Sequence, residues 1–176
     1  MATVTLKGNL IHTIGELPAV GSQAPDFTLV KNDLSDILSS DFKGEKVVLN
    51  IFPSLDTAVC AASVRRFNVE ASKLPDTVVV CISKDLPFAH SRFCTTEGIT
   101  NVIPASEFRS NNFGKSYGVM LIDGPLQGLM ARAVLVLDES GKVIYAELVP
   151  EISLEPDYEA AIQAILSSRL KPAPIA

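Results

Sequence analysis

Lys46-Val-Val-Leu-Asn-Ile-Phe52, followed at once by Pro53-Ser-Leu-Asp-Thr57-Ala-Val-Cys60, is the stretch that says most about the fold of this chain. Its first part is an apolar run, which predicts a strand. Apolar residues then recur at helical spacing from Ala58 to about Leu74, which predicts a helix that begins just before the cysteine. We therefore expect a strand, a short loop and a helix in direct succession.

Cys60 is expected in the first turn of that helix, with Thr57 as the N-cap residue. Free backbone N–H groups and the positive end of the helix dipole lie there. Both favour a thiolate over a thiol, and the thiolate is the nucleophilic form of cysteine. Cys60 is therefore predicted to be a nucleophile, although a capping threonine before a buried, inert cysteine would have the same spacing.

Composition limits the classes of protein to consider. With 176 residues, of which 47% are hydrophobic, the chain can bury one good core, and we expect a single domain over residues 1–176. A net charge of −5 and a pI near 5.0 argue against a nucleic-acid partner. No apolar run approaches the roughly 20 residues that span a bilayer, and the N-terminus lacks the apolar core of a secretory signal. We expect a cytoplasmic protein.

The chain has three cysteines, and lasting disulfides are rare in the cytoplasm. Cys81 lies within the apolar run Asp76–Ser83, a predicted buried strand, and is expected to be a small core residue. Cys94 ends the predicted helix Leu86–Cys94, where it could be reactive or could pack with neighbouring phenylalanines. No Cys/His spacing suggests zinc, and His90 is expected on the surface.

The remaining elements predict an α/β protein with a thioredoxin-like fold and an added N-terminal β-hairpin. In open sheets of this kind the functional site lies beyond the carboxyl ends of the strands, where Cys60 is expected. The further segments are the hairpin Val4–Lys7 and Leu10–Ile14, a strand Phe27–Val30, one helical turn within Asp36–Phe42, a strand near Val102-Ile103, a hairpin from Ala133–Leu137 and Val143–Val149, and a helix Glu155–Leu170.

At this point the sequence resembles a known family. The pattern Pro53-x-x-x-Thr57-x-x-Cys60 matches the active-site pattern of the peroxiredoxins, and the wider string Ser54–Asn68 is similar to the bacterial thiol peroxidase subfamily. Asp85–Cys94, Asp123–Ala133 and Glu155–Glu159 agree with the same subfamily, so the resemblance covers essentially the whole chain. Ala58, where members often carry glycine or proline, and Arg66 in place of a common lysine are mild departures.

The resemblance implies an atypical two-cysteine peroxidase that acts on hydrogen peroxide and organic hydroperoxides. Cys60 would form a sulfenic acid, Cys94 would resolve it as an intramolecular disulfide, and thioredoxin would reduce that disulfide. Pro53 would shield the sulfur, Thr57 would direct its hydroxyl at the sulfur and the attacked oxygen, and Arg132 would place a positive charge beside the thiolate. No cofactor or metal is implied, and the subfamily implies a homodimer.

Several alternatives remain open at the level of sequence. Arg132 could be an exposed arginine at a strand edge or an ion-pair partner of Glu147. The same cysteines could serve a peroxide sensor, whereas a disulfide oxidoreductase is disfavoured because the chain has no Cys-x-x-Cys. Two cysteines on separate helices should start beyond the roughly 7 Å between Cα atoms that a disulfide tolerates. We therefore expect one or both segments to unwind during turnover.

Overall fold

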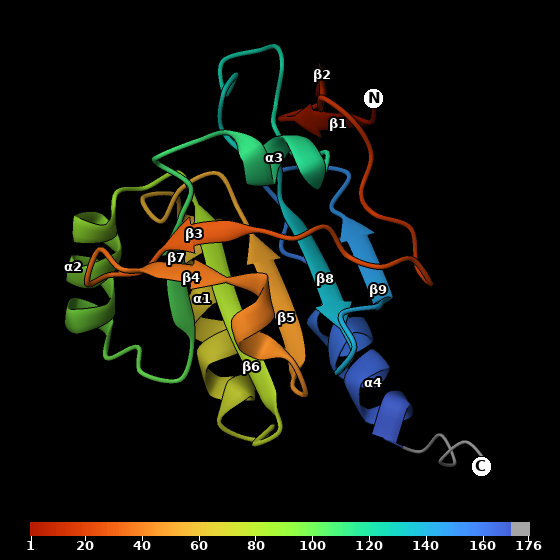
Figure 1. The fold of residues 1–176 in the computed structure, drawn as a ribbon. Coiled ribbons are helices and arrows are strands. Elements are labelled where there is room, and N and C mark those ends of the chain that lie inside the picture. Colours follow the sequence, from red (N-terminus) through yellow and green to blue (C-terminus); the bar gives the residue numbers. More distant parts are fainter. Residues whose placement is uncertain (170–176) are drawn as a thin grey trace.

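The computed structural model describes residues 1–169 and places seven strands of that part of the chain in one sheet, in the order β4-β3-β7-β6-β5-β8-β9 (Figure 1). At its centre β5 (Lys46–Ile51) and β6 (Thr77–Ser83) run parallel. Strand β7 (Ile103–Ser106) continues the parallel arrangement beyond β6, and β8 (Ala133–Leu137) pairs antiparallel with the other side of β5. The carboxyl ends of β5, β6 and β7 therefore meet at one edge.

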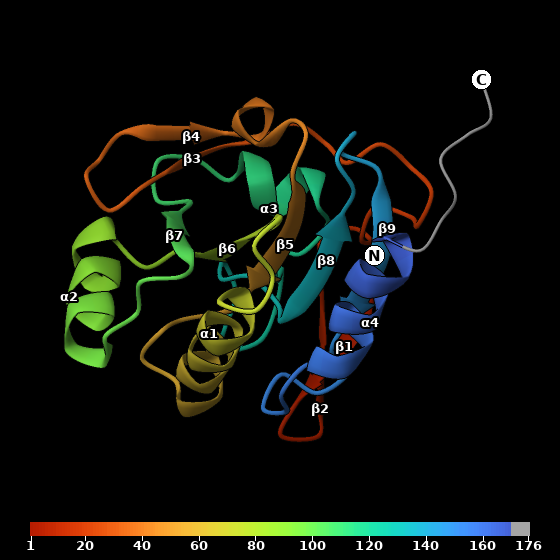
Figure 2. The same cartoon turned by 90° about the horizontal axis from the view of Figure 1, so that it is seen from below.

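Helices cover both faces of this sheet, which explains why its central strands are apolar throughout. Figure 2 shows α1 (Ala58–Ala71) and α4 (Tyr158–Arg169) on one face and α3 (Asn112–Ser116) on the other. Each face packs its own buried cluster, one with Phe67 of α1 and the other with Phe113 of α3. Helix α2 (Pro87–Glu97) lies beside β7. Among the described residues, no helix is both long and apolar enough to cross a membrane.

The sheet ends in antiparallel strands on both sides. Strand β3 (Thr28–Val30) pairs with β4 (Asp36–Leu38), and β9 (Val143–Leu148) pairs with β8. A separate hairpin of β1 (Thr3–Leu6) and β2 (Asn9–His12) turns through Lys7 and Gly8, both with positive φ, as tight hairpins require. Glu151 accepts a hydrogen bond of 2.9 Å from the Gly8 N–H, which ties this hairpin to the C-terminal segment.

The predicted fold is confirmed, and the differences are local. Residues Asp36–Phe42 form strand β4 followed by a 3-10 turn at Ser39–Phe42, instead of one helical turn alone. Helix α4 begins at Tyr158, three residues later than the predicted start at Glu155. Asp157 comes just before it, and its carboxylate accepts from the Ala160 N–H, as an N-cap side chain does. The predicted end of that helix at Leu170 lies outside the described residues.

Candidate active site

Cys60 lies in the first turn of α1, as predicted. Thr57 is the N-cap residue, with φ −99° and ψ 143°, and its hydroxyl oxygen accepts from the Cys60 N–H at 3.4 Å. The same hydroxyl donates to the Ser54 carbonyl at 3.2 Å. The loop between β5 and α1 is thus fixed to the helix start by a residue whose hydroxyl bonds to backbone groups on both sides.

Arg132 lies beside the cysteine sulfur. Its Nη2 is 3.3 Å from Cys60 Sγ, and its Nε donates to the Ile152 carbonyl at 2.9 Å. Both Cys60 and Arg132 are buried, with 0% and 1% of their surface exposed, respectively. The alternative placements of Arg132, at an exposed edge or against Glu147, are therefore wrong.

The register of the sheet explains this contact between residues 72 positions apart. Ala133 pairs with Ile51 across the antiparallel β5–β8 ladder. Arg132 therefore comes next to the end of β5, from which the chain passes through buried Pro53 into the loop before Cys60. Nη1 of Arg132 is buried and has no hydrogen-bond partner among the described residues. A buried, free cationic donor beside a sulfur can bind an oxygen atom that approaches that sulfur.

Cys94 lies on α2 and is partly exposed. It packs against the same apolar cluster that contains Cys60, and burial raises the pKa of its thiol. Phe93 packs there too, whereas Phe88 is 67% exposed and belongs to no apolar face with Cys94. All three cysteines are free thiols in this structure.

Cys81 is the core residue that the sequence predicts. It lies on β6 with 1% exposure, 3.6 Å from the side-chain nitrogen of Asn50. Burial raises the pKa of its thiol to about 12, which keeps it protonated and unreactive at neutral pH.

His90 is not on the surface, contrary to the prediction. It is 1% exposed, and its Nε2 lies 2.8 Å from Ser83 Oγ. His90 lies on the side of α2 that faces the end of β6, where it contacts Ser83. Burial lowers the pKa of its imidazole to about 4.

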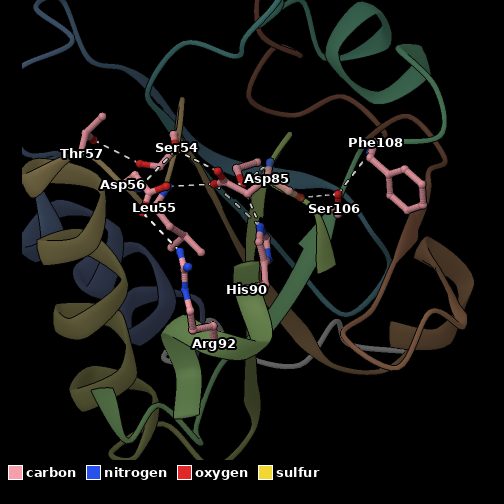
Figure 3. Close-up of polar contacts among 10 residues, drawn as sticks. Ser54, Leu55, Asp56, Thr57, Asp85, His90, Arg92, Ser106 and Phe108 are labelled. Carbon is pink, nitrogen blue, oxygen red and sulfur yellow. Dashed lines mark hydrogen bonds and ion pairs between the residues drawn. The ribbon is translucent and has the colours of Figure 1, made fainter. Parts of the chain in front are cut away.

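The same region holds a polar network that the sequence did not predict. Asp85 lies at its centre and accepts a hydrogen bond from Ser54 (Figure 3). It also accepts one from Ser83. Ser106, at the end of β7, donates to the Asp85 carbonyl at 2.6 Å. Polar residues that end or follow neighbouring parallel strands were the available signal, since such strand ends meet at one edge.

Comparisons with known proteins agree with this geometry. The family model described as Redoxin matches residues 19–162. A thiol peroxidase of Mycobacterium tuberculosis is 58% identical over 165 residues, which cover 94% of this chain and 99% of the relative. A thiol peroxidase of Corynebacterium glutamicum is 56% identical over 165 residues, again 94% of this chain and 99% of the relative.

Solved structures lead to the same group. The crystal structure of a peroxiredoxin-like protein from Aquifex aeolicus superimposes with a TM-score of 0.90 at 40% identity, covering 95% of this chain and 97% of that one. A thiol peroxidase from Chromobacterium violaceum, at 23% identity and a TM-score of 0.88 over 97% and 99% of the two chains, shows the shared fold. With its cysteine at the helix start and an arginine against the sulfur, the chain belongs to the thiol peroxidases of the redoxin family.

Proposed function

We propose that this protein is a thiol-dependent peroxidase in which Cys60 is the peroxide-reducing nucleophile. The observation that carries the proposal is the buried contact of 3.3 Å between Arg132 Nη2 and Cys60 Sγ at the start of α1. The permanent positive charge of Arg132 and the N-terminus of α1 both place positive electrostatic potential where the attacking sulfur and the peroxide oxygens meet. Cys81, in the middle of strand β6, lies neither beside a positive charge nor at a helix N-terminus, and the proposal gives it no part in the reaction.

In the first step the Cys60 thiolate attacks one oxygen of a hydroperoxide, and the O–O bond breaks. The sulfur keeps that oxygen as a sulfenic acid, and the other oxygen leaves, takes up a proton and departs as water or an alcohol. The unpartnered Nη1 of Arg132 is available to donate to the peroxide. Buried Pro53, next to this site, has no N–H that would compete for the sulfur or the substrate.

In the second step the Cys94 thiol attacks the sulfur of the Cys60 sulfenic acid, and water leaves as the disulfide forms. The two cysteines lie on separate helices, which Arg65 of α1 and Glu97 of α2 join through two hydrogen bonds of 2.9 and 3.0 Å. We expect disulfide formation to require local unwinding of α1, α2 or both, because cysteines on two separate helices should start farther apart than the roughly 7 Å between Cα atoms that a disulfide tolerates. Thioredoxin, a dithiol protein, then returns both cysteines to thiols by exchange.

Cysteine variants test these assignments. In an assay with thioredoxin as the reductant, Cys60→Ser should abolish peroxide turnover, and Cys94→Ser should reduce one equivalent of peroxide and then stop. Cys81→Ser is the matched control and should turn over like the wild type. Normal turnover by Cys60→Ser would overturn the proposal, and normal turnover by Cys94→Ser would remove Cys94 from it.

We also propose that the chain acts as a single domain in the cytoplasm and as a homodimer. The subfamily resemblance supports an interface near the loops of the active site and residues Asn101–Tyr117. Sedimentation should give twice the 18.8 kDa of one chain. A single species of 18.8 kDa at micromolar concentration would contradict the dimer.

A further inference from the structure

Asp85 makes three hydrogen bonds with its carboxylate in the loop between β6 and α2. The carboxylate accepts from Ser54 Oγ and from the Leu55 N–H, each at 2.8 Å (Figure 3). It also accepts from Ser83 Oγ at 2.7 Å. Its side chain is 13% exposed, so little water competes for these bonds. Hydrogen bonds to a charged, poorly solvated acceptor are the strong ones.

The network continues from Asp85 into α2. A carboxylate only accepts, so the Ser83 hydroxyl gives its single proton to Asp85. His90 must then donate its Nε2–H to Ser83 Oγ, across the 2.8 Å between them. This assignment leaves Nδ1 of His90 as the nitrogen without a proton, and that buried atom has no partner among the described residues.

The two ends of the network lie in the two segments that carry the cysteines. Ser54 and Leu55 belong to the loop before Cys60, and the Ser54 carbonyl accepts from the Thr57 hydroxyl that caps α1. His90 lies one helical turn before Cys94 on α2. A displacement of either segment must therefore break hydrogen bonds that depend on Asp85.

We propose that Asp85 is a positioning residue that latches the loop before Cys60 to the helix of Cys94, so that the two segments are released together when the disulfide forms. The timing of disulfide formation rests on the proposed function of Cys94, whereas the latch itself is a property of the reduced protein. The two parts can therefore be tested separately.

A second link between the same segments supplies a matched control. Asp56 and Arg92 approach to 4.0 Å, with side chains 80% and 74% exposed. Such an exposed ion pair contributes little. Asp56→Asn removes a carboxylate from the same loop without touching the buried network, and Asp85→Asn removes the carboxylate that the proposal concerns.

Hydrogen exchange of the reduced protein, followed by mass spectrometry, tests the latch. Asp85→Asn should speed exchange roughly tenfold in peptides that cover residues 54–60 and 87–94 together. Asp56→Asn should leave both unchanged. Should Asp85→Asn fold poorly, Ser54→Ala removes one of the two hydrogen bonds from the loop to Asp85 and should have the same double effect, more weakly. Faster exchange in one segment alone, or in neither, would overturn the proposal.

Rapid-quench kinetics then test the consequence for the reaction. The sulfenic acid of Cys60 is generated with one equivalent of peroxide, and the Cys60–Cys94 disulfide is counted against time. Asp85→Asn should form the disulfide roughly tenfold faster than Asp56→Asn or the wild type. An unchanged or slower rate would refute the latch. Failure of the wild type to form this disulfide would refute the role of Cys94, while the exchange result would still decide on the latch.

Discussion

Replacing Arg132 by methionine should slow the reaction of Cys60 with peroxide. Methionine fills a similar length of the buried site, but it has no charge and no N–H donor. The variant loses the contact of 3.3 Å to Cys60 Sγ and the unpartnered Nη1 donor. It also leaves the Ile152 carbonyl without the donor that it has at 2.9 Å.

The size of the effect follows from these contacts. A hydrogen bond to a charged group contributes about 1.5–3 kcal/mol, which corresponds to a factor of about 10 to 150 in rate if the bond stabilises the transition state. Loss of the Nη1 donor can only add to this factor. The unpaired Ile152 carbonyl costs about 1–3 kcal/mol of folding stability, an effect that must be measured separately.

Stopped-flow competition against a second peroxidase would give the second-order rate constant for hydrogen peroxide. We expect Arg132→Met to lose at least tenfold while its circular dichroism stays native. Arg109→Met is the matched control, because Arg109 is 51% exposed and pairs with Asp36 on the surface. A loss of less than threefold in folded Arg132→Met would refute the role of this arginine.

Three further predictions concern residues around the site and in the core. Cys81→Ser should keep wild-type turnover and lose about 1–2 kcal/mol of stability in urea unfolding, since a hydroxyl replaces a buried thiol; loss of activity in the folded variant would contradict this. His90 takes up its proton near pH 4 when folded and near 6.5 when unfolded, so acid favours unfolding between these values. The stability advantage of wild type over His90→Gln should therefore shrink by about 2 kcal/mol from pH 7 to pH 4.5, and a constant difference would exclude the buried, neutral His90. Leu135→Ala, at a fully buried position of β8, should cost about 2–5 kcal/mol without changing the peroxide rate at Cys60 in the folded protein, and a loss below 1 kcal/mol would contradict its place in the core.

Local sequence patterns were sufficient to predict the unit that carries Cys60. The apolar run of β5, the capping Thr57 and the helical spacing after it are all short-range signals, and the structure follows them closely. Cys81 was predictable for the same reason, since it lies in the middle of a continuous apolar strand.

The contacts between distant segments were not predictable from the residues alone. Arg132 reaches Cys60 because β8 pairs with β5 in one particular register. The residues next to Arg132 in the sequence are equally compatible with a buried and an exposed side chain. The burial of His90 was not predictable, because nothing in the sequence of this short, weakly amphipathic helix distinguishes a buried histidine from an exposed one. The network of Asp85 requires the ends of three strands to meet, which only the folded sheet brings about.

The most direct test of the two-cysteine peroxidase mechanism is a peptide map by mass spectrometry after reduced protein has reacted with one equivalent of cumene hydroperoxide. We predict a disulfide between Cys60 and Cys94, with Cys81 still a free thiol. Three unmodified thiols, or a disulfide that includes Cys81, would contradict it.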